Sequence, residues 1–389
     1  MENFEFLSPT RIIFGRGVEE RVGEETKKYA GKVLLHYGGG SIKRSGLYDK
    51  IVASLKGAGV DFIELSGVQP NPRLSLVQEG IKVCREQKIG FILAVGGGSV
   101  IDSAKAIGVG VEYSGDVWDF YANKAIPEKA LPTGAVLTIP AAGSEASKSS
   151  VITNENGWLK WGLNVELNRP RFAVMNPELT FTLPPYQTAC GAVDIMAHVM
   201  ERYFTDVKHV DLTDRLCEAT LKTMIVNTPI AIAQPDNYDA RAEMMWAGTL
   251  AHNDLLSTGR LGDWAPHMIE QELSAIYDVA HGAGLAVIFP AWMKYMLHRN
   301  MEKFTQFAVR VWDVEYDFED PERTAMEGIK RLEDFYRRIG MPVTLRELGI
   351  SSDRLEEMAG KAIKPWTFTV GNVSKLSRDE VLSILKLAL

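Results

Sequence analysis

The spacing of apolar and polar positions changes near residue 185 of the chain. Before that point, short and continuously apolar runs alternate with stretches whose apolar residues recur at helical spacing. This alternation is typical of a parallel sheet covered by helices. After Pro185, long helical patterns follow one another without a comparable strand. The pattern therefore predicts an α/β domain over residues 1–182 and an all-α domain over residues 183–389.

The same periodicity predicts the individual elements. We expect strands within 4–14 and at 32–36, 61–65, 91–95, 135–139 and 171–175, and a hairpin over 147–153 and 157–162. Helices are expected at 47–58 and 74–87 in the first domain and at 211–227, 239–257, 301–311, 321–339 and 377–389 in the second.

Small residues follow three of the expected strands. They are Gly38, Gly39, Gly40 and Ser41 after the first, Gly96, Gly97, Gly98 and Ser99 after the second, and the run 140–145 after the third. Glycines let backbone N–H groups approach a phosphate, and the helix that follows adds a partial positive charge. Ligands of open α/β sheets bind along this edge. The pattern favours an anion site, although a tight turn without a ligand has the same local sequence.

Four residues of the second domain suit a divalent metal ion. Asp194 and His198 are four positions apart, so they share one face of a helix. His267 and His281 would lie roughly 21 Å apart on one helix, whereas the ligands of one metal lie about 2 Å from it. A helix must therefore end between these two histidines. A single histidine is more often an ordinary core or surface residue, and only the set of four favours a metal site.

Composition excludes several other classes of protein. The chain is 46% hydrophobic and 24% charged, which is typical of a globular protein. A net charge of -7 argues against a nucleic-acid partner, since phosphate binding needs a basic face. The apolar runs are shorter than the roughly 18 residues of a membrane-spanning helix, and the acidic start is not a secretory signal. Three cysteines without paired spacing indicate a reducing compartment, so we expect a cytoplasmic protein.

Together these motifs resemble the iron-containing (group III) alcohol dehydrogenases, and in particular their butanol dehydrogenase and broad aldehyde reductase branch. The resemblance covers nearly the whole chain and rests on Phe14-Gly15, the glycine turns, residues 140–145, Asn176-Pro177, Asp194-x-x-x-His198, His267 and His281-Gly282. It implies a Rossmann-like parallel-sheet domain followed by a helical domain, as in the dehydroquinate synthase architecture. It also implies a homodimer, with the strand within 4–14 as a possible pairing element.

The resemblance assigns roles to these residues. Asp194, His198, His267 and His281 would hold Fe²⁺ or Zn²⁺, which would polarise an alcohol or aldehyde oxygen while hydride moves between that carbon and a nicotinamide. The metal and the cofactor would then meet between the domains. The cofactor residues implied are Gly38, Gly39, Gly40 and Ser41, the pyrophosphate site Gly96, Gly97, Gly98 and Ser99, Asp102 near the nicotinamide, Thr138, Ser144 and Lys160 along the crevice, and Thr182 and Leu183 near the adenine.

Two positions refine this expectation. Relatives that use NAD tend to carry an acidic residue after the first Rossmann strand, but residues 36–41 contain none. Ser41 and Lys43 could accept a 2′-phosphate, so we expect NADP(H) to be preferred over NAD(H). Many relatives also carry a histidine four residues after the third ligand, where this chain has Gln271. Glutamine does not titrate near neutrality, which leaves water, a ribose hydroxyl or His252 to exchange the proton.

The expected activity is the interconversion of small primary alcohols, such as butanol, and their aldehydes. A polyol or glycerol-type dehydrogenase of the same fold is the near alternative. From other classes, a metal-dependent lyase or hydrolase and a non-catalytic nucleotide-binding protein with a structural metal remain open. Four aromatic residues are candidates for the wall of a substrate pocket, with ordinary core packing as the alternative: Trp158, Trp161, Trp264 and Phe289.

Overall fold

The computed structural model describes residues 1–389, which divide into two compact units. The sheet unit contains Leu7–Leu183 and Pro235–Asn253. The helical unit contains Met1–Phe6, Pro184–Gln234 and Asp254–Leu389. None of the helices is long and apolar enough to span a bilayer.

A six-stranded parallel sheet forms the centre of the sheet unit, with the strand order β1-β8-β5-β4-β2-β3. Its strands are β1 (Arg11–Phe14), β2 (Lys32–Tyr37), β3 (Asp61–Leu65), β4 (Phe91–Gly96), β5 (Thr133–Leu137) and β8 (Phe172–Met175). Every residue of β4 and β5 is buried, because helices cover both faces, and this explains their continuous apolar sequence. A separate antiparallel hairpin joins β6 (Ser149–Asn154) and β7 (Leu159–Asn164).

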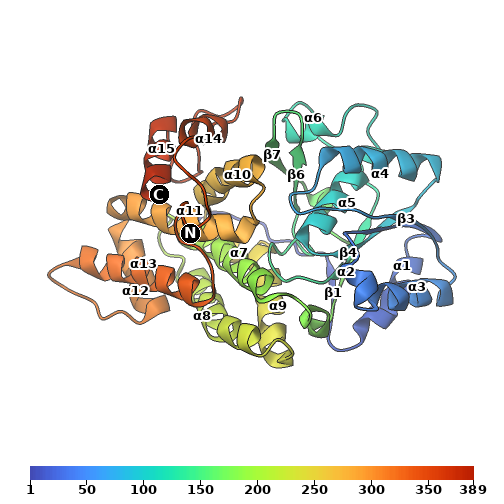
Figure 1. The fold of residues 1–389 in the computed structure, drawn as a ribbon, viewed down its shortest axis with the longest axis horizontal. Helices are drawn as coiled ribbons and strands as arrows, with labels where there is room; N and C mark the ends of the chain where they lie inside the picture. The colour runs from blue at the N-terminus through green and yellow to red at the C-terminus, as the bar shows by residue number, and fades with distance from the viewer. The chain divides into compact units, whose positions relative to one another are not determined.

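Helices lie on both sides of this sheet (Figure 1). The helices α4 (Leu74–Glu86) and α5 (Gly98–Val111) pack on one face through residues such as Ile81 and Ile107, and α1 (Val22–Lys27) and α3 (Leu47–Gly57) pack on the other through Val22 and Ile51. The remaining helices of the unit are α2 (Ser41–Arg44), α6 (Trp118–Tyr121), α9 (Tyr238–His252) and the 3-10 turns η1 (Val18–Arg21), η2 (Glu166–Asn168) and η3 (Pro177–Thr180).

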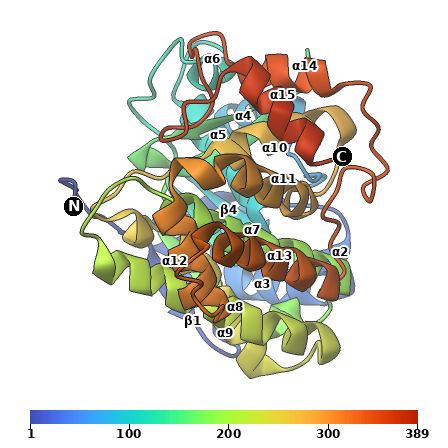
Figure 2. The same ribbon diagram turned by 90° about the vertical axis from the view of Figure 1, so that its left-hand side faces the viewer.

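The helical unit is built around two buried helices, α7 (Pro185–Tyr203) and α11 (His281–Met296). The others are α8 (Asp211–Ala233), α10 (Ala265–Tyr277), α12 (Met301–Trp312), α13 (Pro321–Arg338), α14 (Leu355–Ala362), α15 (Arg378–Leu387), and the 3-10 turns η4 (Leu255–Ser257) and η5 (Leu297–Arg299). Figure 2 shows α12 and α13 side by side. A capping box of Ser377 and Glu380 begins α15.

The predicted fold class is confirmed, but several strand boundaries differ from the expectation, and the hairpin strands begin at Ser149 and Leu159 and not at 147 and 157. The strand expected at 135–139 runs from Thr133 to Leu137, because its neighbour β4 ends at Gly96, opposite Leu137, and leaves nothing to pair with further on. The strand expected within 4–14 begins only at Arg11, after Pro9, which has no N–H to donate. Phe4 and Phe6 are exposed and lie outside any strand.

Two helix boundaries also differ. The helix α8 continues past the expected end at residue 227 to Ala233 and includes Pro229, while the buried side chain of Ala231 anchors its last turn. The helix α9 stops at His252 and not at residue 257, since Asp254 adopts a left-handed conformation with φ of 72° that a helix cannot continue through.

Candidate metal centre and cofactor site

The helix α7 places two of the expected ligands in the interior of the helical unit. Pro185 stands at its first turn, where a missing N–H costs nothing. Asp194 and His198 lie one turn apart, and their side chains are only 7% and 5% exposed. The Nε2 atom of His198 lies 3.3 Å from Oδ1 of Asp194. The spacing of four residues therefore brings both side chains to one point, as predicted.

The break expected between His267 and His281 is present. The helix α10 ends at Tyr277, Asp278 takes a left-handed φ of 52°, and α11 begins at His281. Both histidines thus lie near helix starts. Gly282 is required at the second position of α11, because a Cβ there would lie 2.1 Å from the carbonyl oxygen of Cys190 on α7. The close approach of α11 to α7 brings His281 to Asp194.

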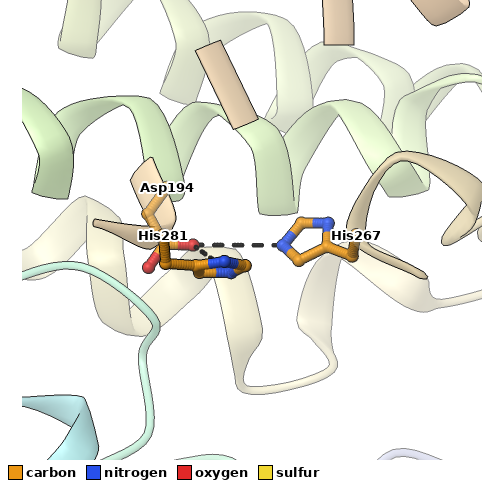
Figure 3. Close-up of side chains that lie close together, drawn as sticks. All are labelled: Asp194, His267 and His281. Carbon is orange, nitrogen blue, oxygen red and sulfur yellow. Dashed lines mark ion pairs between the residues drawn. The ribbon is translucent and has the colours of Figure 1, made fainter. Parts of the chain in front are cut away.

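His267 and His281 converge on one carboxylate oxygen of Asp194 (Figure 3). Oδ1 of Asp194 lies 3.9 Å from Nε2 of His267 and 3.8 Å from Nε2 of His281. Possible ligand atoms of these three residues all lie within 4.8 Å of one another. The ring of His198 stands 4.5 Å from that of His267, centre to centre. All four expected ligands are therefore brought together by α7 and by the consecutive helices α10 and α11, which come much later in the sequence.

The chemistry of this cluster fits a divalent cation. Oδ1 of Asp194 and Nε2 of His267 are buried and have no hydrogen-bond partner in the protein, although buried polar atoms normally have one. Burial acts to lower the pKa of His267, but the Asp194 and Glu201 carboxylates outweigh it and raise this pKa to about 9. The cluster thus attracts positive charge, and imidazole with carboxylate suits Fe²⁺ or Zn²⁺.

Two carboxylates that were not predicted from the sequence contact the Nδ1 atoms of two of the histidines. Glu201 accepts a hydrogen bond from Nδ1 of His267 at 2.7 Å, and Glu270 accepts one from Nδ1 of His281. Both carboxylate side chains are 0% exposed. A signal was available, since Glu201 follows His198 by three residues and Glu270 follows His267 by three, which places each near a ligand on its helix.

One of the four aromatic candidates for a pocket wall, Trp264, lies at this centre within the helical unit. Trp264 has its ring 5.6 Å from that of His198 and 5.3 Å from that of His267. Phe289 is fully buried in α11, and Trp161 stacks on Trp118 in the sheet unit. Trp158 is 45% exposed, with the guanidinium of Arg73 over its ring. Within their own units, Phe289 and Trp161 are therefore core residues and Trp158 is a surface residue.

In the sheet unit, the turn from β4 into α5 has the geometry of an anion site. Gly96 ends the strand, Gly97 caps the helix, and Gly98 and Ser99 form its first turn. A Cβ at Gly96 would lie 2.5 Å from Val100, so the tight turn requires glycine there. The N–H groups at this helix start are therefore directed outward from the carboxyl edge of the sheet.

Polar side chains are joined beside this turn. Ser144 donates a hydrogen bond of 2.5 Å to Asp102, and the buried amine of Lys105 donates to Ser144 at 2.8 Å. Burial raises the pKa of Asp102, while the positive charges of Lys105 and Lys160 act against that rise. Thr138 donates its N–H to the carbonyl of Gly96. Five expected cofactor residues, Gly96, Asp102, Thr138, Ser144 and Lys160, thus form one neighbourhood.

Other expected cofactor residues lie apart from that neighbourhood along the chain. Thr182 and Leu183 follow η3 at the end of the main segment of the sheet unit.

Two histidines of the sheet unit are held by hydrogen-bond contacts. His252, on α9, contacts the carbonyl oxygen of Ala142 through Nδ1 at 2.7 Å. Burial lowers the pKa of His36 to about 4, and its ring bonds to Leu65 and Ser103, so this neutral histidine offers no cation for a phosphate.

A positively charged and a negatively charged side chain lie near the turn after β2, which consists of Gly38, Gly39, Gly40 and Ser41. Lys43 follows it on α2, and the next strand, β3, contributes Glu64, whose carboxylate lies 3.7 Å from Nζ of Lys43. Glu64 also accepts hydrogen bonds of 2.6 Å from the hydroxyl groups of Tyr37 and Tyr48. Residues 36–41 contain no acidic side chain, but the neighbouring strand β3 places Glu64 beside Lys43. This contact was not predicted from the sequence.

A parallel sheet with glycine turns and a helical unit with a buried aspartate–histidine cluster are the two parts of a metal-dependent dehydrogenase. Known proteins agree with that class. Residues 9–177 match the family described as iron-containing alcohol dehydrogenase, and residues 188–389 match the C-terminal part of the Fe-containing alcohol dehydrogenase family.

Individual relatives match along the whole chain. A probable NADH-dependent butanol dehydrogenase of Bacillus subtilis is 47% identical over 100% of both chains. An NADPH-dependent aldehyde reductase of Escherichia coli is 37% identical over 93% of each. The crystal structure of an NADH-dependent butanol dehydrogenase from Thermotoga maritima, 42% identical, superposes with a TM-score of 0.96 and covers 100% of this chain and 99% of its own.

The chain therefore belongs to the iron-containing alcohol dehydrogenase family, in its butanol dehydrogenase and aldehyde reductase branch. It is an NAD(P)-dependent enzyme that interconverts alcohols and aldehydes.

Proposed function

We propose that this enzyme catalyses reversible hydride transfer between small primary alcohols, such as butanol, and the corresponding aldehydes. Asp194, His198, His267 and His281 would hold one divalent ion, Fe²⁺ or Zn²⁺. The observation that carries the proposal is the buried Asp194 oxygen with the Nε2 atoms of all three histidines within 3.3 to 3.9 Å. The printed names of the relatives, butanol dehydrogenase and aldehyde reductase, support the choice of substrate class.

The residues around the cluster would orient the substrate. A bound metal ion supplies Lewis-acid polarisation of the substrate oxygen. Trp264 makes T-shaped ring contacts with His198 and His267 and would limit the space next to them. The side-chain oxygen of Gln271, one turn after His267, is buried and accepts no hydrogen bond within the protein. We propose that it accepts one from an alcohol hydroxyl and so aligns the substrate without taking up its proton.

The sheet unit would bind the cofactor through its carboxyl edge. We propose that Gly96, Gly97, Gly98 and Ser99 hold the pyrophosphate with backbone N–H groups. Asp102 and Ser144, already joined by a hydrogen bond, would orient the nicotinamide end. Because the two side chains restrain each other, neither has to be ordered anew when the cofactor binds.

Metal removal tests the proposed function. Protein stripped with a chelator is expected to lose butyraldehyde reduction, and reloading with Fe²⁺ or Zn²⁺ is expected to restore it, because polarisation of the carbonyl is worth several kcal/mol. The measurement is the oxidation of NADPH or NADH with a panel of aldehydes after defined metal loading. A stripped protein that reduces butyraldehyde as fast as the reloaded one would exclude this mechanism.

The preference for NADP(H) predicted from the sequence forms a second part of the proposal. Lys43 would pair with a 2′-phosphate, while Glu64, 3.7 Å from its amine, shares that charge and keeps the advantage of NADPH below about tenfold. We expect Glu64→Gln to raise the ratio of kcat/KM for NADPH to that for NADH several-fold, and Lys43→Met to lower it. Glu86→Gln, which removes another exposed carboxylate near a lysine, should leave the ratio unchanged. If kcat/KM of the wild type is tenfold higher with NADH than with NADPH, the proposed preference for NADP(H) is wrong, while the proposed metal site and reaction are unaffected.

A further inference from the structure

Glu201 connects α7 to the start of α10. One of its oxygens accepts hydrogen bonds from the backbone N–H and from Nδ1 of His267, at 3.0 and 2.7 Å, and the other accepts from the N–H of Trp264 at 2.6 Å. A carboxylate at a helix start also meets the positive end of the helix dipole. Glu201 therefore holds both the ring of His267 and the first turn of the helix that carries it.

Glu270 plays a similar part for His281, but it makes different contacts. Its carboxylate lies on α10 and accepts hydrogen bonds from Nδ1 of His281 and from the hydroxyl of Ser274. Gly284, one turn into α11, leaves the space for it, since a Cβ there would lie 2.5 Å from Oε1 of Glu270. Glu270 thus spans the break between α10 and α11.

These contacts determine which ring nitrogen is available to a metal. A carboxylate can only accept, so Nδ1 of each histidine must carry the proton that it donates. In the neutral ring Nε2 then has a free lone pair, and in both residues Nε2 lies within 3.9 Å of Oδ1 of Asp194. Neutral imidazole with an unprotonated nitrogen is the form that binds a metal.

We propose that Glu201 and Glu270 are the positioning residues of the metal centre, each fixing one histidine in the tautomer and orientation that ligates. This inference rests on the proposed metal site. Partners of this kind are worth about 10- to 100-fold in metal affinity. Glu201 also accepts hydrogen bonds from the backbone at the start of α10, and Glu270 accepts them from the side chains of His281 and Ser274.

The test uses Glu201→Gln and Glu270→Gln, because glutamine keeps the shape but has an amide that can donate to Nδ1 and so favour the wrong tautomer. Dissociation constants for Co²⁺ and Zn²⁺ are measured by chelator competition, together with the visible absorption of the Co²⁺ protein and the Tm of the metal-free protein. We expect both variants to bind metal about 10- to 100-fold more weakly. Glu201→Gln should also lower the Tm of the metal-free protein more than Glu270→Gln does, because it loses a contact with the backbone at the start of α10.

Glu218→Gln is the matched control. Glu218 is a buried carboxylate of the same unit that accepts hydrogen bonds from Tyr203 and Gln306 and touches no ligand histidine. It should lower the Tm without changing the metal affinity or the Co²⁺ spectrum. If the wild type binds Co²⁺ and both test variants bind it equally tightly with an unchanged spectrum, the inference is wrong. If the wild type itself binds no metal, the proposed function fails instead.

Discussion

An Asp194→Asn variant is expected to lose at least about 1,000-fold in kcat/KM for aldehyde reduction, which corresponds to about 4 kcal/mol. The reason is the central position of Asp194. Its Oδ1 lies within 3.9 Å of Nε2 of His198, His267 and His281. Asparagine keeps the shape but removes the negative charge, so the remaining imidazoles should hold a divalent ion far more weakly.

The measurement combines steady-state kinetics with metal content after dialysis and the Tm of the metal-free protein. We expect the fold to persist, because Oδ1 of Asp194 makes no hydrogen bond within the protein. Asp211→Asn, on the exposed side of α8, serves as the control and should match the wild type in metal content and rate. A variant at residue 194 with full metal content and wild-type kcat/KM would rule out the proposed centre.

Gly282→Ala is expected to have the largest effect of any glycine substitution near the site. The new methyl group would lie 2.1 Å from the carbonyl oxygen of Cys190, which is backbone and cannot rotate away. The start of α11 must then move away from α7, which carries His281 away from Asp194. We expect a loss of more than about 2 kcal/mol in the free energy of unfolding and at least about tenfold weaker metal binding.

Denaturant unfolding and chelator competition measure these two quantities. Gly360→Ala is a suitable control, because Gly360 lies in α14 and its added Cβ would meet only the side chain of Arg378, at 3.8 Å. Alanine there should stabilise the helix by up to about 1 kcal/mol and leave the metal affinity unchanged. Wild-type stability in Gly282→Ala would contradict the close packing of α11 against Cys190 of α7.

Much of the fold could be predicted because the responsible signals are local. The buried strands β2 and β4 carry mostly apolar sequence on both faces, and the expected and observed boundaries of β2, β3 and β4 differ by one residue at most. The strand β5 was displaced because its end depends on where β4 stops pairing, which its own residues do not encode. The end of α9 depended on one left-handed residue, Asp254, whose conformation is also set by its surroundings.

In the site too, some features followed from local sequence and others depended on contacts between elements. The residues at 194 and 198 could be paired from spacing alone, and the loop between His267 and His281 followed from the length of a helix. Glu64 was missed because it reaches Lys43 from a different strand, 21 positions away in the sequence. Glu270 was missed because its partner lies across a turn, so no helical period relates it to His281.

By itself the sequence determined the order of elements, the kinds of ligand side chain and the need for a helix break, since these follow from periodicity, side-chain chemistry and chain length. Only the tertiary structure decided which atoms meet. The close approach of α11 to α7, permitted by Gly282, brings His281 to Asp194, and the folding of α10 against α7 gives His267 its buried carboxylate, Glu201. Contacts between helices depend on packing across the whole unit, and no local pattern encodes them.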